Sequence, residues 1–227
     1  MSKPVSPRPS RRSVLATGFS AALVTPSFAQ SGDFDSFLLS LRAEARAFGV
    51  SDATFQSAIA GLTFDPGPVR SSGGQGEFSR PFWDYVNGAA SAGRINAGKA
   101  AAGRATNAFS WIRSNLGVDR SVVAGIWGME SNFGTGMGSS DVLRSTASLA
   151  FRQVRGDFYR KEFIAALKIL DEGHVTRAGF VGSWAGAMGQ PQFIPSSFLK
   201  YAIDADGDAA RISGAPRWMR WRQPRTT

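Results

Sequence analysis

The spacing of apolar residues restricts this chain to a mainly helical fold. In several segments between residues 30 and 208, large apolar side chains recur every three or four positions, as they do along one face of an α-helix. No stretch alternates apolar and polar residues in the period-two pattern of a half-buried strand. The apolar fraction of 43% is sufficient for a core. We therefore expect one mainly α domain over residues 30–208.

Helices are expected where this spacing meets start and stop signals. The sequence predicts a helix over 34–48 that ends at Gly49, and a short helix capped by Ser51. It also predicts soft helices within 82–116, a helix over 157–172 and a short helix that Ser196 or Ser197 caps. Residues 65–80 are rich in Gly, Pro and Ser, and they predict a loop.

The formal net charge of +9 is concentrated at the two ends of the chain. Four basic residues lie in 1–29 and five in 209–227, and neither end has an acidic residue. They account for the whole excess and leave 17 basic and 17 acidic residues between the ends. A nucleic-acid partner is therefore not expected, because binding to phosphates needs a basic surface.

The cysteine and histidine content excludes several kinds of site. The chain has no cysteine, which excludes disulfides, thiol catalysis and cysteine-ligated zinc. A single histidine, His174, excludes multi-histidine metal sites. We interpret His174 as a solvated loop residue, with a Ser-His-Asp triad through it as the alternative.

Residues 1–29 have the features of an export signal. Arg11-Arg12 precedes an apolar segment, and Ser27-Phe28-Ala29 supplies the small residues that a signal peptidase reads. The arginine pair fits a twin-arginine signal, and a general secretory signal fits equally well. No later apolar run is long enough to cross a bilayer. We therefore expect a periplasmic or secreted protein without a transmembrane anchor, its mature form beginning near Gln30.

Glu130 lies near the end of an otherwise apolar helix that Asp119 is suited to cap. Helical spacing places Glu130 on one face with Val122, Val123, Ile126 and Trp127. A carboxyl group on such a face loses hydration, which raises its pKa toward the value that a general acid needs near neutral pH. A structural Glu paired with an arginine is the alternative interpretation.

Two later segments have the composition of binding loops. Residues 179–195 contain four glycines among Trp and Gln side chains. This composition suits a groove that binds sugar, and an ordinary structural loop is the alternative. Asp204, Asp206 and Asp208 then occupy positions one, three and five of a calcium-loop pattern. The glycine and the closing carboxylate of that pattern are missing, so a solvated acidic turn is the alternative to a structural calcium site.

Three motifs in this order resemble the lytic murein transglycosylase B family. They are Glu130-Ser131-Asn132-Phe133-Gly134, GSWAGAMGQPQFIPSSF at 182–198 and YAIDADGD at 201–208. The similarity runs from about Phe34 to Asp208 and includes Gln75-Gly76-Glu77-Phe78 and Arg94-Ile95. The resemblance implies a lysozyme-like helical catalytic domain that acts on the glycan strands of peptidoglycan.

The resemblance also implies a reaction. The family cleaves the β-1,4 bond between N-acetylmuramic acid and N-acetylglucosamine with a single Glu, which corresponds to Glu130. That Glu protonates the leaving oxygen and then takes the proton of the muramic acid C6 hydroxyl. The product is a 1,6-anhydro sugar, and neither a cofactor nor a carboxylate pair is required. Asp141 is close enough in sequence to be examined as a second carboxylate.

Further site residues follow from the same resemblance. Ser183 and Gln192 are expected to contact the sugar, and Met129 to lie beside the acid. Arg155 and Tyr159 are expected to line the groove. Relatives often carry two successive basic residues where this chain has Arg155-Gly156, which puts one substrate contact in question.

Residues 209–227 depart from the family pattern. After the Asp-rich loop the family continues into more of its catalytic domain, whereas a basic, Trp-containing tail follows here. In a shifted reading frame, the single-codon residues Trp218 and Met219 spell an Asp codon between them. We therefore expect a frameshift, a catalytic domain incomplete at its C-terminus and an aberrant tail that does not fold. A genuine divergent tail is the alternative.

Two functions compete with the transglycosylase reaction. A hydrolytic muramidase would use water in place of the C6 hydroxyl. A non-catalytic remnant would bind peptidoglycan without cleaving it, and an incomplete domain favours this alternative.

Overall fold

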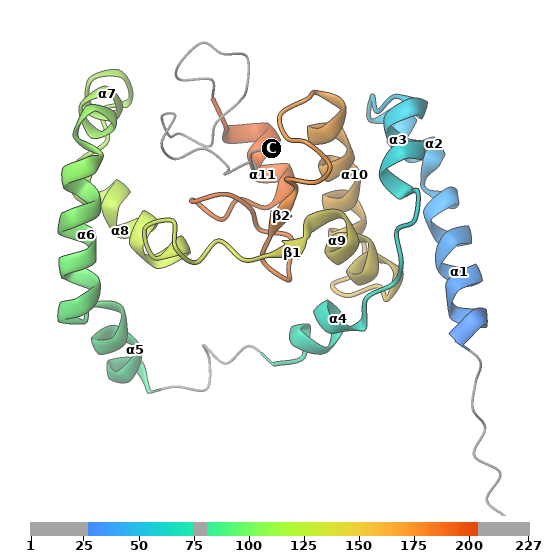
Figure 1. The fold of residues 1–227 in the computed structure, drawn as a ribbon, viewed down its shortest axis with the longest axis horizontal. Coiled ribbons are helices and arrows are strands. Elements are labelled where there is room, and N and C mark those ends of the chain that lie inside the picture. The colour runs from blue at the N-terminus through green and yellow to red at the C-terminus, as the bar shows by residue number, and fades with distance from the viewer. Residues whose placement is uncertain (1–26, 75–80, 204–227) are drawn as a thin grey trace, which may run out of the picture.

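The computed structural model describes residues 27–74 and 81–203 and confirms a mainly α fold (Figure 1). The helices of this part of the chain are α1 (Ser27–Ser40), α2 (Arg42–Ala47), α3 (Asp52–Ile59), α4 (Pro66–Ser72), α5 (Phe82–Ala89), α6 (Ala92–Arg104), α7 (Thr106–Leu116), α8 (Arg120–Ser131), α9 (Val142–Phe151), α10 (Phe158–Asp171) and α11 (Pro195–Tyr201). The strands are β1 (Ser140–Asp141) and β2 (Val181–Gly182).

The larger core forms around α9 and α10, which pack against each other and against α11 and the N-terminal helices. Its fully buried side chains come from segments far apart in the sequence, such as Phe34, Leu143 and Phe163. The rings of Phe34 and Phe151 meet edge to face, with centroids 5.3 Å apart. These contacts fix α1 against α9.

A smaller core joins α6, α7 and α8, which lie on the other side of the molecule (Figure 1, green). Ala101 of α6 and Ala105, which links α6 to α7, are fully buried there, beside Phe109 and Trp127. Small side chains on α6 let the three helices approach closely, and the two aromatic rings fill the space between them. This core carries α8 and therefore Glu130.

A short antiparallel pair of strands lies between the two cores (Figure 1). Ser140 pairs with Gly182 and Asp141 with Val181. Residues 182–193 then fold back on themselves through bridges from Met188 to Gly182 and to Phe193. The strands themselves are two residues long, which is too short for a period-two pattern to be visible in the sequence.

The predicted helices are found, with three differences. The helix expected over 34–48 is interrupted at Leu41 between α1 and α2, and Phe48 is 52% exposed and so lies outside the core. The loop expected over 65–80 contains α4, whose cap Asp65 accepts a hydrogen bond from the backbone of Gly67. The sequence did not predict α9, because eight of its ten residues are buried and no polar face marks it.

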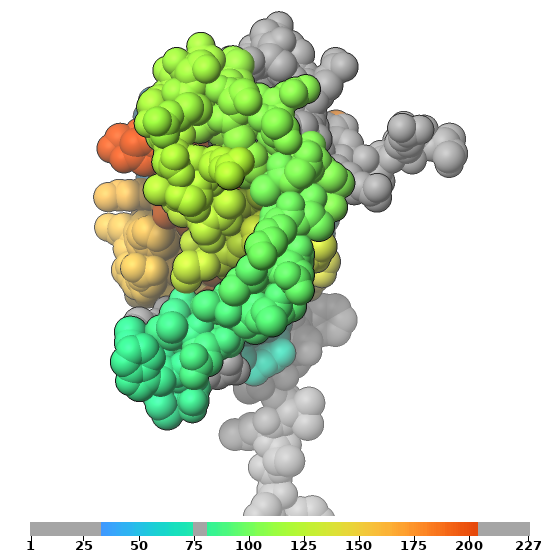
Figure 2. All heavy atoms as spheres, turned by 90° about the vertical axis from the view of Figure 1, so that its left-hand side faces the viewer, coloured from blue at the N-terminus to red at the C-terminus, as the bar shows by residue number. Residues whose placement is uncertain are grey.

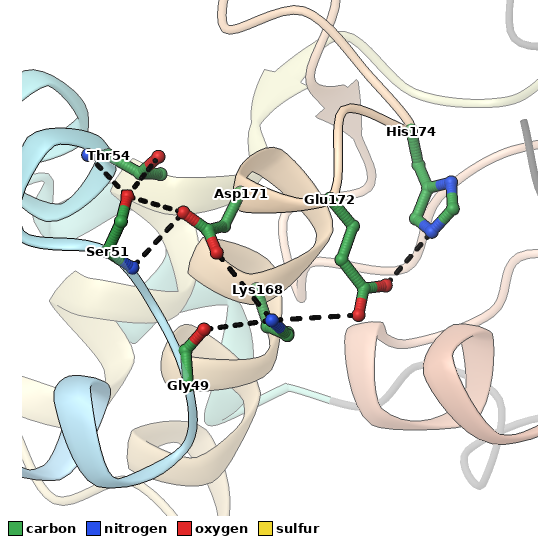
Figure 3. Close-up of polar contacts among 7 residues, drawn as sticks. All are labelled: Gly49, Ser51, Thr54, Lys168, Asp171, Glu172 and His174. Atoms are coloured by element: carbon green, nitrogen blue, oxygen red, sulfur yellow. Dashed lines mark hydrogen bonds and ion pairs between the residues drawn. The ribbon is translucent and has the colours of Figure 1, made fainter.

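A polar network at one end of α10 fixes the N-terminal helices to the larger core (Figure 3). Asp171 accepts hydrogen bonds from the backbone and hydroxyl of Ser51, at 3.1 and 2.6 Å. Lys168 lies between Asp171 and Glu172 and donates to the carbonyl of Gly49. Glu172 continues the network to His174.

The interpretation of His174 as solvated was wrong. Its side chain is only 7% exposed, with Nε2 3.0 Å from Glu172 and the ring 5.5 Å from that of Phe198. The polar partner described for its imidazole is Glu172, and the alternative of a Ser-His-Asp triad stays a prediction.

Two predictions fall largely or wholly outside the described residues. The export signal of 1–29 overlaps the structure only at Ser27–Ala29, where α1 begins, and the tail of 209–227 does not overlap it. Within the described ranges, no helix is long and apolar enough to span a membrane.

Candidate active site

Glu130 lies in the last turn of α8, a helix that begins as the sequence predicts. Asp119 caps it by accepting hydrogen bonds from the backbone and hydroxyl of Ser121, at 2.8 and 2.6 Å. The helix ends at Asn132, which adopts a left-handed conformation with φ of 46°. Glu130 is the only carboxylate between residues 120 and 140.

The expected burial of Glu130 was wrong, because α8 has two apolar faces. The smaller core covers the face that includes Trp127 and Gly128. Glu130 lies on the other face and is exposed, next to a stripe of apolar side chains that are each more than half exposed: Val122, Ile126 and Met129. The carboxyl group of Glu130 therefore adjoins an apolar surface that is open to a ligand.

The C-terminal end of α8 is held by the ring of Phe133. This ring lies edge to face with Trp127, at 5.5 Å between centroids. It fits between α6 and α8 only because both helices have a glycine there: a Cβ on Gly98 or on Gly128 would come within 2.6 Å of it. Phe133, three residues after Glu130, thereby fixes the turn that carries the carboxylate.

Three contacts join α8 and its following loop to the 182–193 segment. Trp127 Nε1 donates to Gln190 Oε1 at 2.6 Å inside the protein, and Gln192 Nε2 donates to the carbonyl of Met137 at 3.2 Å. Gly138 lies so close to Gly182 that a Cβ would meet its carbonyl at 2.2 Å. The helix bearing Glu130 and the segment bearing Ser183 and Gln192 are therefore neighbours.

Ser183 and Gln192 shape this segment through their own hydrogen bonds. The Ser183 hydroxyl accepts from the backbone of Ala187 at 3.0 Å, and Gln192 Nε2 also donates to the carbonyl of Gly189 at 2.9 Å. Gln192 has a positive φ of 51°, which is uncommon outside glycine. Both side chains are only partly buried, so a ligand can still reach them.

Arg155 lies in the turn before α10, and Tyr159 lies in the first turn of that helix. The Arg155 guanidinium is stacked 4.4 Å from the centroid of the Phe158 ring. Tyr159 is 4% exposed and belongs to a small buried cluster against which Trp184, the residue after Ser183, packs. Burial raises the pKa of the Tyr159 hydroxyl, and the charge of Arg155 partly opposes this effect. The phenol therefore stays protonated at neutral pH.

Asp141 has a structural role in this arrangement. Its Oδ1 accepts from the backbone of Arg144 at 3.2 Å and caps α9, while its Oδ2 pairs with Arg177 at 2.7 Å. Both oxygens are thus occupied by cap and ion pair. The calcium-loop residues Asp204, Asp206 and Asp208 lie outside the described residues, and within the described ranges no three acidic, His or Cys side chains are grouped as metal ligands.

Comparison with known proteins decides the family. The model of the transglycosylase SLT domain matches residues 33–213, well over half of the chain. The chain belongs to this family. Over 93 residues it is 36% identical to membrane-bound lytic murein transglycosylase B of Escherichia coli K12, a match that covers 40% of this chain and 26% of that protein.

Solved structures of the SLT family agree with the fold. SltB3 of Pseudomonas aeruginosa, in complex with NAG-NAM-pentapeptide, is 41% identical with a TM-score of 0.74, over 78% of this chain and 47% of SltB3. SltB1 of the same organism is 29% identical with a TM-score of 0.65, over 78% of this chain and 59% of SltB1. The chain spans about half the length of these two relatives.

The sequence did not identify two buried polar side chains that join distant segments of the fold. Gln190 is 6% exposed and joins the segment of Ser183 to Trp127. Glu162 is 3% exposed and accepts hydrogen bonds from the backbone and hydroxyl of Ser196, at 2.9 and 2.7 Å. Glu162 thus replaces the expected Ser cap of α11. Its position on the buried side of an amphipathic α10 was the available signal.

Proposed function

We propose that this SLT domain cleaves the β-1,4 bond between N-acetylmuramic acid and N-acetylglucosamine in peptidoglycan and leaves a 1,6-anhydro product. The observation that carries the proposal is the position of Glu130. It is the only carboxylate of its helix and loop, it adjoins an open apolar stripe, and it neighbours the segment with Ser183 and Gln192. The family membership supports the same reaction class.

The proposed chemistry needs one carboxyl group. Glu130 in its acid form donates a proton to the glycosidic oxygen as the bond from that oxygen to C1 of muramic acid breaks. The carboxylate then accepts the proton of the C6 hydroxyl, whose oxygen bonds to C1. No water is consumed, and Glu130 returns to its acid form. Unlike paired-carboxylate glycosidases, this reaction leaves no step for a second carboxylate.

An exposed Glu130 is compatible with this proposal because the substrate itself can remove water. A sugar ring packed on Ile126 and Met129 would cover the carboxyl group from the solvent side. Glycan binding would thereby shield the proton transfer from bulk water.

The partly buried polar groups of the neighbouring segment have a role in this proposal. Ser183 and Gln192 keep acceptor or donor capacity beyond their internal hydrogen bonds, which suits contacts to sugar hydroxyl and acetamido groups. Arg155 adds a cation beside Phe158, and Tyr159 lies in the buried cluster on which Trp184 packs. We assign these four residues and Met129 to the glycan-binding surface.

The product identifies the reaction. We would digest purified sacculi with the chain and analyse the released fragments by mass spectrometry. Muropeptides lighter by one water than the hydrolysis product are expected. Reducing-end fragments would instead identify a hydrolytic muramidase. Binding to sacculi with no fragment released would identify a non-catalytic binding protein and contradict the proposal.

We further propose that the protein works outside the cytoplasm, where peptidoglycan is found. The support is the basic, apolar and small-residue sequence of 1–29. Fractionation of cells that produce the tagged chain tests this: we expect the tag in the periplasm or the medium, and retention in the cytoplasm would contradict it.

A further inference from the structure

A second groove lies on the other side of α8 from the proposed catalytic surface. It has a volume of about 760 Å³ and runs between α6, α7 and the N-terminal half of α8. Figure 2 faces this side of the molecule, where α6 and α7 form the near surface (green). Ser121 and Ala124 line the groove, and at 3.6 residues per turn they point away from the direction of Glu130. The groove is therefore separate from the proposed glycan surface.

The groove carries an excess of positive charge. Lys99, Arg113 and Arg120 line it, with Asp119 as its single carboxylate. Asp119 is already engaged by Ser121 and by an ion pair of 3.0 Å with Arg113. Within the described ranges, no carboxylate lies within ion-pair distance of Lys99. Residues 92–127 contain five basic residues and one acidic residue. Acidic residues elsewhere between the two ends of the chain balance this local excess, so the net charge does not reveal it.

Helix stability does not explain the position of Arg120. It is the first residue of α8, at the positive end of the helix dipole, where a cation is unfavourable. The nearest carboxylate is the cap Asp119, which feels the charge of Arg120 but makes its hydrogen bonds to Ser121 and its ion pair to Arg113. A cation in this position is therefore available for an anionic ligand.

The lining of the groove indicates the kind of anion. Its floor is apolar and made of small side chains and one buried ring: Ala102, Ala124 and Phe109. Thr106, Ser110 and Ser121 also line the groove and contribute hydroxyl groups. An acidic peptide with small apolar side chains matches both parts. A nucleic acid matches less well, because no exposed aromatic ring in the groove offers a stacking surface for bases.

We infer that this groove binds a short acidic peptide through its carboxylates, with Lys99 and Arg120 as the main contacts. The identification of that peptide as a peptidoglycan stem peptide rests on the proposed function. Its small alanyl side chains would lie on the floor while its carboxylates meet the cations. The site would hold the domain on peptidoglycan independently of the glycan being cleaved.

The test is a titration of the full chain with free stem pentapeptide, followed by calorimetry or NMR. We expect saturable binding that weakens with added salt, because the groove is open to solvent. The double variant Lys99→Ala/Arg120→Ala should bind at least tenfold more weakly. A matched control, Arg104→Ala/Lys161→Ala, removes two exposed cations outside the groove and should bind normally. A pentapeptide with its carboxylates amidated should not bind.

Three outcomes would overturn the inference: no binding of the pentapeptide, equal loss in the control variant, or tighter binding of a single-stranded oligonucleotide than of the peptide. The result is separable from the proposed catalytic function. Glu130→Gln should bind the pentapeptide normally, and Lys99→Ala/Arg120→Ala should still cleave glycan strands from which the peptides have been removed. A thermal melt of each variant verifies that it is folded.

Discussion

Trp127 Nε1 donates a buried hydrogen bond of 2.6 Å to Oε1 of Gln190. The two residues are 63 positions apart and belong to different parts of the fold: Trp127 to the smaller core and Gln190 to the segment that follows β2. The bond therefore fixes the helix of Glu130 to the loop of Ser183. A contact in the protein interior therefore sets how the two proposed halves of the active site lie relative to each other.

Removal of the acceptor should loosen this junction. Gln190→Met keeps the length of the side chain but leaves the indole N–H without this acceptor, which typically costs about 1–3 kcal/mol for a buried donor. We expect a lower free energy of unfolding in urea and slower sacculus digestion. The comparison variant Gln192→Met, at a partly buried position, should lose less stability. Equal stability of Gln190→Met and the parent would contradict the role of the bond.

Two glycines of α8 should respond in opposite ways to the same substitution. Gly128→Ala places a Cβ 2.6 Å from the Phe133 ring and should destabilise the domain by about 1–3 kcal/mol. Gly125 has open space around its Cβ position, so Gly125→Ala should stabilise the helix by roughly 0.5–1 kcal/mol. Urea unfolding measures both. Phe133→Ala should remove most of the penalty of Gly128→Ala, and a penalty that persists would locate its cause elsewhere.

The contact between Ser51 and Asp171 should make stability depend on pH. The Ser51 hydroxyl is the main cause that lowers the pKa of Asp171 below its ordinary value of 3.8. Because the pKa of Asp171 is lower in the folded protein than in the unfolded chain, its carboxylate stabilises the fold at pH values above 3.8. That stabilisation is lost as the pH falls through the lowered pKa. Ser51→Ala also removes the cap of α3, worth about 1 kcal/mol. Its deficit relative to the parent should therefore be larger at pH 7 than at pH 2.5.

A nearby serine provides the control for this pH effect. Ser57 is exposed and donates only to the carbonyl of Thr54 among its described contacts. Ser57→Ala should show the same small deficit at both pH values. If the stability deficit of Ser51→Ala does not change with pH, the deficit comes from the lost cap alone, and the proposed effect on Asp171 is contradicted.

Glu162 should matter for the position of α11. Glu162→Gln keeps the size of the side chain but replaces one carboxylate oxygen, so the backbone and hydroxyl of Ser196 cannot both keep their acceptors in the same geometry. We expect a loss of about 1–3 kcal/mol in urea unfolding. Ser196→Ala, which keeps the backbone donor, should lose less. If Glu162→Gln has the same free energy of unfolding as the parent, the second acceptor oxygen is dispensable and the prediction is wrong.

Local signals made part of the fold predictable. The Asp119 cap and the start of α8 follow from neighbouring residues, and both are found where the sequence predicts them. The strongly amphipathic α10 was predicted for the same reason. α9 was missed because its burial on nearly all sides removes the polar face that reveals a helix.

The site was less predictable, because it depends on contacts between distant segments. The sequence places Glu130 and Trp127 on one apolar face, but only the packing of α6 and α7 decides that Trp127 is buried and Glu130 exposed. Of two neighbouring glutamines, the resemblance drew attention to Gln192, whereas Gln190 makes the buried bond to Trp127. The basic groove is equally invisible in the net charge, because acidic residues elsewhere balance its cations.

The most direct test of the central claim compares the parent chain, Glu130→Gln and Asp84→Asn in the digestion of sacculi. Asp84 is an exposed carboxylate on α5 and serves as the control. Loss of a general acid typically costs about 100- to 10,000-fold in rate. We predict that Glu130→Gln releases at least about 100-fold less anhydro-muropeptide while it melts and binds sacculi like the parent. Anhydro-muropeptides released by Glu130→Gln at the parental rate would contradict the account.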